Sequence, residues 1–553
     1  MSVLTRVTFD MIKGFLSAVR VTYESAAGIT RSLASRLKDT RTLEDFGAVG
    51  DNTTDDTVAV QAAMLWVAAA SGRKLVSGKG TGYKITAPIM VDFSGNKGCS
   101  VNIGAPFLPV DNLGDMLTFK NTRDSVFLLS VRDGGASASN PNYGTSDPAG
   151  AQQAFVLQGL RSCSVNVRGY NYKGRVLRTK LETVGQYKTS SNSFVIFTGE
   201  NNTPCGQALY AEGSSNWGTI QEWYSNWDLY GPVLYEVEDV TIVHLEGGWA
   251  TNNGMVLAGV GSLHGVVVAI GNENPGSTIK SLHIKQSSSG KQCRRISILD
   301  LLIAGAYDGL WIEADGMASE DIASYFKITT SNSRRYGVYA NNARDTTFIH
   351  GATGDYIPLR YSGNSYGCKY QINSAKSRLQ AIQIDATTLN GVFSGHILSA
   401  GYELTGAPCI ACDSVANLRF DNMHVQTLVS LNNAGAYKLV AGNKVRVTGG
   451  TIEKDSGTTP SFAGNVLPLR VMDVVGFVNK GSGASFIPAG ALFVDVAHGM
   501  NVRPSTVSCT RSAGFTQPIR VNLVSNDSTF KVTVDSAMAA DAYFYWSADA
   551  IRS

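Results

Sequence analysis

Apolar and polar residues alternate in many short segments in the middle of the chain. Five of these segments begin with a polar or aromatic residue and a glycine, and apolar positions then alternate: 253–257, 264–268, 308–312, 336–340 and 390–394. An alternation with a period of two predicts β-strands, and the recurrence of one short pattern predicts a repeat architecture. Further alternating segments lie between them, at 240–244, 281–285, 296–300, 346–350 and 444–448.

The pattern favours a coiled solenoid in which each turn supplies several strands. The intervals between the recurring segments are irregular and correspond to one or two turns of roughly 22 to 28 residues. Such intervals differ from those of strictly periodic repeats and indicate insertions between turns. We attribute the recurring glycine to corners that need positive φ angles and leave no room for a Cβ atom. We therefore predict an all-β fold, a right-handed parallel β-helix, over residues 41–480.

The two ends of the chain differ from this pattern. Val3, Val7, Met11 and Phe15 follow a helical spacing, which predicts a short helical segment within residues 1–40. A second helix is expected to begin near Val58, capped by Thr54 or Asp55. After residue 480 the spacing of strands and turns changes, and we predict a separate small β-sandwich over residues 481–553.

The segment between residues 45 and 61 carries a specific motif. It contains Asp-Phe-Gly-Ala at 45–48, then Asp51, Thr54, Asp55, Asp56, Thr57 and Gln61. This motif resembles the N-terminal β-helix motif of the pectate-lyase-like superfamily, which is widespread in bacteriophage tailspikes and capsule depolymerases. The resemblance implies that Asp51, Asp55 and Asp56 organise the first turns of the β-helix.

The resemblance also implies partners and a location. A tailspike is a homotrimer in the virion, made in the host cytoplasm, and it binds a bacterial surface polysaccharide. Residues 1–40 would then attach the chain to the phage tail or to an adaptor protein. Residues 481–553 resemble the terminal modules of phage fibre proteins, on the Ala-His-Gly turn at 497–499 and the closing strand near Trp546, which implies trimerisation or a carbohydrate contact.

Composition excludes several other classes. Charged residues make up only 16% of the chain and the net charge is +3, without a basic stripe, so nucleic acid is not an expected partner. The eight cysteines are far apart, and Cys409 and Cys412 have no second pair to complete a zinc site, so we expect buried free thiols. We predict no metal and no cofactor. Arg6, Asp10 and Lys13 interrupt the N-terminal apolar residues, so we expect a soluble chain without membrane insertion.

Residues 306–315 are the strongest candidate for a functional site. If Leu310 and Ile312 point inward, alternation places Trp311, Glu313 and Asp315 on the outer face. An exposed aromatic ring beside carboxylates is suited to binding and cleaving a sugar. The alternative is that the acids are solvated surface residues and that the tryptophan packs under a loop or at a subunit contact.

Asp308 is a further candidate, because the segment 307–311 looks like the aromatic-Asp-Gly-aromatic segment of tailspike endoglycosidases. Asp308 would then help to cleave the polysaccharide. The alternative is a turn residue, since an aspartate before a glycine often binds its own backbone.

Other turns of the β-helix offer partners for this site. We predict Glu273 as the second catalytic acid. We predict that the following residues bind substrate together with Trp311: Trp249, Tyr339, Arg334 and Glu246.

These candidates support an endo-acting glycoside hydrolase. Such an enzyme uses two carboxyl groups, roughly 5 to 5.5 Å apart for retention or 6.5 to 9.5 Å for inversion. A polysaccharide lyase remains the enzymatic alternative, with Arg334, Arg335, Arg344 and His350 as its candidate cations and base. Two further alternatives are a receptor-binding fibre without activity and a lyase outside any virion, although the lack of a signal peptide argues against secretion.

Overall fold

The computed structural model describes residues 39–549 with interruptions. The parts outside the described residues are 1–38, 111–112, 133–151, 173, 181–188, 199–205, 214–215, 229–230, 250–253, 272–277, 314–323, 364, 386–387, 399, 402–406, 414–415, 428–434, 440–443, 455–461, 464–469, 473, 475–479, 499, 501–503, 505, 513–516, 523–528 and 550–553. The helical segment predicted within residues 1–40 therefore lies almost wholly outside the described part.

A short N-terminal cap precedes the repeats. It consists of β1 (Thr40–Thr42), the 3₁₀ helix η1 (Glu44–Phe46), β2 (Asp51–Asp55) and α3 (Thr57–Ala68). Asp56 accepts hydrogen bonds from the backbone N–H groups of Val49 (2.6 Å) and Gly50 (3.1 Å), and Asp55 accepts one from the N–H of Thr57 at the start of α3. Asp51 binds two backbone N–H groups of its own turn. These contacts give the three aspartates the structural role expected of them.

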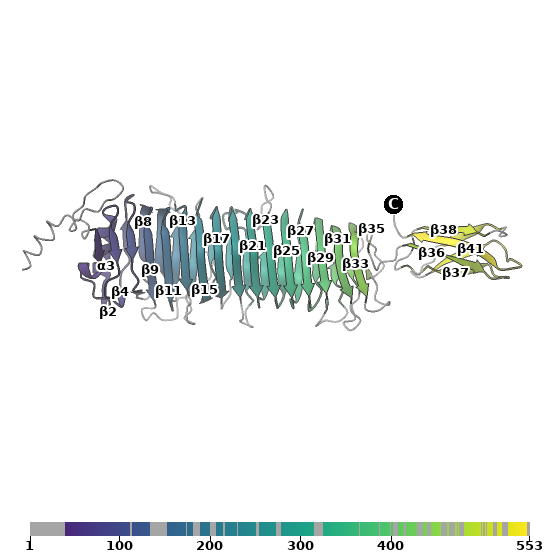
Figure 1. Ribbon diagram of the computed structural model, residues 1–553, viewed down its shortest axis with the longest axis horizontal. Coiled ribbons are helices and arrows are strands. Elements are labelled where there is room, and N and C mark those ends of the chain that lie inside the picture. Colours follow the sequence, from purple (N-terminus) through teal and green to yellow (C-terminus); the bar gives the residue numbers. More distant parts are fainter. Residues whose placement is uncertain are drawn as a thin grey trace, which may run out of the picture. The chain divides into compact units, whose positions relative to one another are not determined.

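The body of the chain is a right-handed parallel β-helix, as predicted. It divides into two compact units, residues 1–279 with 287–298 and residues 280–286 with 299–553. Consecutive strands alternate between two parallel ladders, so the chain adds one strand to each ladder per turn. Figure 1 shows the odd-numbered strands as rows of parallel arrows.

In the first unit, four short strands lead into the odd-numbered ladder: β3 (Lys74–Val76), β4 (Gly82–Ile85), β6 (Ser100–Asn102) and β7 (Phe107–Pro109). The odd-numbered ladder contains β9 (Val126–Arg132), β11 (Ser164–Tyr170), β13 (Asn192–Thr198), β15 (Gly218–Asp228), β17 (Val240–Trp249) and β19 (Leu263–Gly271). The even-numbered ladder contains β5 (Ile89–Asp92), β8 (Asp115–Arg123), β10 (Gln153–Arg161), β12 (Arg175–Lys180), β14 (Gln207–Glu212), β16 (Val233–Tyr235) and β18 (Met255–Ala258).

The second unit repeats the arrangement. Its even-numbered strands are β20 (Lys280–Lys285), β22 (Asp308–Ile312), β24 (Tyr336–Asn341), β26 (Ile357–Ser362), β28 (Ile382–Ile384), β30 (Ile410–Cys412), β32 (Tyr437–Lys438) and β34 (Phe462–Ala463). The odd-numbered strands are β21 (Ile296–Ala304), whose first residues belong to the first unit, then β23 (Ser324–Ser331), β25 (Thr346–Thr353), β27 (Lys369–Ala375), β29 (Thr388–Leu398), β31 (Ala416–Thr427), β33 (Lys444–Lys454) and β35 (Arg470–Met472).

Inward side chains stack along the axis of this unit. Five buried rings follow one another on β23, β25, β27, β29 and β31, with centroids 4.6 to 5.5 Å apart: Phe326, Phe348, Tyr370, Phe393 and Phe420. Each ring is an inward position of one turn, so the in-register pairing of the strands places them in a column. This column is the continuous apolar core that the alternating pattern predicts.

At two of the recurring glycines there is no room for a Cβ atom, as expected, but the φ angle is not positive. Gly309 and Gly337 do not have positive φ angles; a Cβ atom on Gly309 would lie 2.1 Å from the carbonyl oxygen of Gly337. The predicted positive φ was therefore wrong, and close approach of successive turns is the reason for these glycines. Left-handed conformations occur instead at many turn residues such as Asn332 (φ 55°) and Asn342 (φ 55°), which tolerate them through local side-chain hydrogen bonds.

A buried polar cluster joins β23 and β25. Thr330 donates its hydroxyl proton to Asp355, so the Nε2 of His350, 2.7 Å from the same hydroxyl, acts as the donor in that contact. The Nδ1 of His350 is then unprotonated and has no hydrogen-bond partner among the described residues. Burial lowers the pKa of His350 to about 3.

This cluster should make the stability of the protein depend on pH. The pKa of His350 is lower in the folded state than its ordinary value of 6.5, so unfolding takes up a proton below that pH and stability falls. Between pH 7 and pH 5 we expect a loss of about 2 kcal/mol, and His350→Gln should remove that part of the dependence. Chemical unfolding of both proteins at the two pH values measures it; an unchanged pH dependence in the variant would refute this origin.

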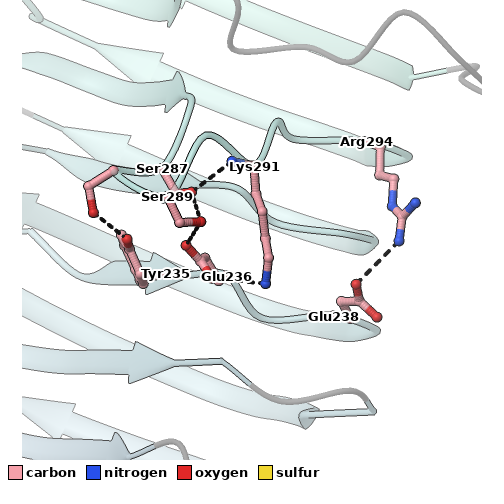
Figure 2. A network of polar contacts seen from close by, with 8 residues as sticks. Tyr235, Glu236, Glu238, Ser287, Ser289, Lys291 and Arg294 are labelled. Atoms are coloured by element: carbon pink, nitrogen blue, oxygen red, sulfur yellow. Dashed lines mark hydrogen bonds and ion pairs between the residues drawn. The ribbon is translucent and has the colours of Figure 1, made fainter.

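A second polar network ties turns of the first unit together (Figure 2). Glu236 accepts a hydrogen bond from Ser289 (2.5 Å) and pairs with Lys291 (2.9 Å), while Glu238 pairs with Arg294 at 3.2 Å in a more exposed position. Although burial raises the pKa of Glu236, the contacts with Ser289 and Lys291 outweigh it and lower the pKa to about 2.

We expect Glu236→Gln to lower the free energy of unfolding at pH 7 by about 2 kcal/mol. The contribution is present above pH 4.5 and is lost as the pH falls toward 2, so wild type and variant should converge in acid. Glu238→Gln is the matched control, because its exposed pair with Arg294 should contribute less than about 1 kcal/mol. Equal effects of the two substitutions at pH 7 would contradict the expectation.

The C-terminal part consists of two antiparallel three-stranded sheets. One has the order β36 (Lys480–Ile487), β41 (Ala542–Asp549), β38 (Thr506–Arg511), and the other β37 (Phe493–Ala497), β40 (Thr529–Val534), β39 (Ile519–Asn522). A separate apolar core that includes Phe530, Val532, Phe544 and Trp546 lies between them. This is the architecture predicted for residues 481–553.

The cysteines are in the reduced form throughout the described part of the chain. Six of the seven described cysteines are buried, and Cys509 is half-buried. Burial raises the pKa of several of these thiols, that of Cys368 to about 11. Among the described residues no helix is long and apolar enough to cross a membrane.

Candidate functional site

The pairing of β20, β22, β24, β26 and β28 places one outward side chain of each strand in a line. We call these five residues the outer row: His283, Trp311, Tyr339, Arg360 and Gln383. Their neighbours on either side in the sequence, such as Leu310 and Ile312, are fully buried. The inward orientation predicted for Leu310 and Ile312 is thus confirmed.

Aromatic rings form the centre of the outer row. The ring centroids of Trp311 and Tyr339 lie 4.0 Å apart with an angle of 34° between the planes. Tyr336 adds a third ring, 5.5 Å from Tyr339 and 6.2 Å from Trp311. Trp311 and Tyr339 are half-buried. We call these three residues the aromatic platform.

Cationic side chains surround this platform. The Nζ of Lys280 lies 4.4 Å from the ring centre of Trp311, and the guanidinium carbon of Arg335 lies 4.9 Å from it. The guanidinium of Arg360 lies 5.4 Å from the ring of Tyr339. Such cation–π contacts hold both partners in place.

Each of these cations also pairs with a carboxylate. Lys280 binds Glu313 at 2.7 Å, and Arg360 binds Asp385 at 2.6 Å. Arg335 binds both oxygens of Asp308, with 2.8 Å from its Nε to Oδ1. The platform is therefore rigidly supported, and its formal charges are balanced pair by pair.

Glu313 is the candidate carboxylate on the same strand face as Trp311. Its Oε1 lies 2.9 Å from Nε2 of His283 and 2.7 Å from Nζ of Lys280, while its side chain remains 40% exposed. The hydrogen bond with His283, assisted by Lys280 and opposed by burial, lowers the pKa of Glu313 to about 2. Burial lowers the pKa of His283. Glu313 is thus an ionised carboxylate at neutral pH, suited to act as a nucleophile or base and not as an acid.

Asp308 occupies a different environment. It is fully buried, and burial raises its pKa while the guanidinium of Arg335 acts in the opposite direction. Asp308 and Glu313 are five residues apart along an extended strand, which separates their Cα atoms by roughly 16 Å. They are therefore too far apart to act as the two carboxyl groups of a glycosidase, and the arrangement favours a structural ion pair at Asp308.

The structure brings Trp311, Tyr339 and Glu313 together as the sequence predicted. Arg334 instead lies beside Tyr307, with its guanidinium 6.0 Å from that ring, and the neighbouring Arg335 contacts Trp311.

Of the remaining candidates, one lies elsewhere and the others cannot be placed. Glu246 is exposed on β17 of the odd-numbered ladder, so it does not share a face with β22. Asp315, Glu273 and the side chain of Trp249 lie outside the described residues.

One candidate of the lyase alternative is corrected. His350 is completely buried inside the β-helix and contacts Thr330, so it does not reach a substrate on the surface. A lyase at this site would need another base.

Sequence reasoning missed Lys280, Arg360 and the contact of His283 with Glu313. A regular interval could have revealed them, because the register partners Lys280, Asp308 and Tyr336 follow one another every 28 residues. Aligning the segments at this interval places His283, Trp311 and Tyr339 in one column. The shorter turns that bring in Arg360 and Gln383 break the interval, so the column ends there in the sequence.

Comparisons with known proteins identify related architectures only. No family model and no curated protein matches the chain. A mutant tailspike protein of E. coli bacteriophage HK620, solved with a pentasaccharide, aligns with 98% of this chain and 100% of its own at 10% identity and a TM-score of 0.44. A second mutant of that tailspike, also with a pentasaccharide, aligns over 98% and 100% at 11% identity and a TM-score of 0.42. The fold of this chain is established by its own strand pairing.

Proposed function

We propose that this chain binds a polysaccharide along the outer row of its second unit and cleaves it by endo-glycosidic hydrolysis. The observation that carries the proposal is the half-buried pair of rings on the outer face, Trp311 and Tyr339, on the same strand face as the ionised Glu313. Sugar rings present C–H faces that pack on aromatic rings, and a carboxylate at their edge is the group that glycosidases use.

The rigidity of the platform supports this assignment. Lys280 and Arg335 contact Trp311 and are themselves held by Glu313 and Asp308. A binding surface whose side chains are fixed before the ligand arrives loses less conformational entropy on binding. Asp308 then supports the site from beneath without touching substrate.

Glu313 is the proposed nucleophile or general base. Its second oxygen, Oε2, has no hydrogen bond or ion pair to the described residues, because the contacts with Lys280 and His283 are both made by Oε1. A hydrolase also needs a protonated carboxyl group, and Asp315 and Glu273 remain our proposals for it. If the acid lies about 5 Å from Glu313 the reaction retains configuration, and at a larger separation it inverts.

The biological setting follows from the motif at residues 45–61. We propose a phage tailspike in the virion, a homotrimer whose N-terminal segment attaches to the tail or an adaptor and whose ligand is a bacterial capsule, exopolysaccharide or O-antigen. The β-helix body with its lateral platform is consistent with this role.

The test is to incubate the full chain with capsule and lipopolysaccharide preparations and to follow new reducing ends together with the absorbance of unsaturated uronates. Reducing ends without that absorbance support hydrolysis. Absorbance would mean a lyase, and binding without either signal would mean a receptor-binding fibre.

Loss of the central ring should weaken binding strongly. We expect Trp311→Ala to reduce the affinity for the cleaved polysaccharide by about 10- to 100-fold, because a large stacking surface is lost from the middle of the platform. Tyr366→Ala is the control, since that exposed tyrosine lies outside the outer row. Calorimetric titration with an oligosaccharide fragment measures both, and an unchanged affinity in the Trp311 variant would exclude this face.

A further inference from the structure

The C-terminal domain carries a second group of exposed aromatic rings, independent of the β-helix. Tyr543 and Tyr545 on β41 are 54% and 62% exposed, and Phe486 on β36 is 39% exposed. The rings of Phe486 and Tyr543 lie 5.3 Å apart. Large side chains with this exposure, gathered on one face, mark a contact surface more often than scattered exposed residues do.

The strand register explains why they share a face. Phe486 is directly opposite Tyr543, and Tyr545 lies between Ala484 of β36 and Thr510 of β38. Alternate residues of β41, Phe544 and Trp546, point into the core of the domain. Tyr543 and Tyr545 are two residues apart on one strand, or about 6.8 Å. Because Ala484 and Thr510 are small, they leave the ring of Tyr545 exposed to solvent.

Hydroxyl groups complete the same face. Ser547 is the next residue of β41 on the same face as Tyr545. It is opposite Ser482 of β36 and Ser508 of β38. The hydroxyl oxygens of Ser508 and Ser547 are 3.2 Å apart. The following eight residues thus make up what we call the C-terminal face: Ser482, Ala484, Phe486, Ser508, Thr510, Tyr543, Tyr545 and Ser547.

The composition of the C-terminal face indicates its occupant. None of its eight residues is charged, and none is an aliphatic residue larger than alanine. Protein interfaces are depleted in serine and alanine, which here supply four of the eight positions. A stable protein interface also needs about 20 to 30 residues on each side, far more than this face provides. Rings flanked by hydroxyl groups instead match the C–H faces and hydroxyl groups of an uncharged sugar.

We propose that the C-terminal face is a carbohydrate-binding site for neutral sugar residues, separate from the outer row of the β-helix. Sugar rings stack on Tyr545 and Tyr543, and the serine and threonine hydroxyls exchange hydrogen bonds with sugar hydroxyls. None of the eight residues offers a cationic partner, so an anion would lose water on this face without compensation, which selects against uronates and other acidic sugars. Lys480 and Asp549, opposite each other at the next position in register, lie at its edge.

Affinity electrophoresis of the full chain tests this proposal. Native gels contain dextran, galactomannan or starch as neutral polysaccharides, or alginate as an acidic one. We expect at least one neutral polysaccharide to retard the wild-type protein, alginate not to do so through this face, and Tyr545→Ala to lose about tenfold or more in apparent affinity. Phe493→Ala is the matched control, because Phe493 is 49% exposed in the same domain but lies on the other sheet.

Two further comparisons separate this site from the alternatives. Trp311→Ala should leave the retardation by the neutral polysaccharide unchanged, whereas its loss would assign the binding to the outer row and overturn the proposal. Sedimentation of the Tyr545→Ala variant should show the oligomeric state of the wild type. A lower oligomeric state would mean that a second copy of the chain covers this face, and retardation by no neutral polysaccharide would overturn the proposal as well.

Discussion

Replacing Glu313 with glutamine is expected to lower the rate of polysaccharide cleavage by roughly 10²- to 10⁴-fold, the range typical for loss of a positioned carboxylate in proton transfer. Glutamine keeps the size of the side chain and a hydrogen-bond acceptor for Lys280 and His283, so binding should change little. Reducing-end formation measures the rate, and retention in polysaccharide gels measures binding.

Asp413→Asn is the control for this substitution, because Asp413 is also a partly exposed, ion-paired carboxylate and lies away from the platform. The pH dependence gives a second check. Since the pKa of Glu313 is about 2, its protonation should not lower the activity between pH 7 and pH 4. Full activity of Glu313→Gln would remove this residue from the mechanism.

Replacing Gly309 with alanine is expected to destabilise the second unit by several kcal/mol or to prevent its folding. The added Cβ atom would lie 2.1 Å from the backbone oxygen of Gly337 in the next turn, and neither backbone can move without breaking the register that continues through β22 and β24. Thermal unfolding followed by circular dichroism measures the effect.

Gly351→Ala is the matched control in the same unit, because the nearest atoms to its Cβ position are 3.9 Å away. It should shift the unfolding midpoint by only a few degrees. If both substitutions had the same small effect, the close approach of successive turns would not be what keeps glycine at position 309.

The fold could be predicted because its cause is local and repeated. Alternation in segments such as 308–312 and 336–340 specifies strands with one buried face, and the motif near Asp51 and Asp56 indicates the first turns. The lack of room for a Cβ atom at the glycines was expected, but the positive φ angle was wrong, because the steric contact comes from the neighbouring turn and not from a corner. No property of Gly309 in the sequence reveals that Gly337 lies against it.

The site could be predicted only in part. Trp311 and Glu313 were found because both lie on one strand, where alternation fixes the face of each residue. The partners that set the properties of Glu313, Lys280 and His283, come from the preceding turn, and their proximity follows from a register that the irregular turn lengths obscure. Asp308 was misleading for the same reason, since its ion pair with Arg335 forms across turns.

A crystal structure of the Glu313→Gln variant with an oligosaccharide fragment of the polysaccharide that the wild type cleaves would show where the polysaccharide binds. We expect sugar rings packed on Trp311 and Tyr339, with a glycosidic oxygen beside the side chain at position 313. An oligosaccharide bound elsewhere on the β-helix, with this face empty, would contradict this expectation.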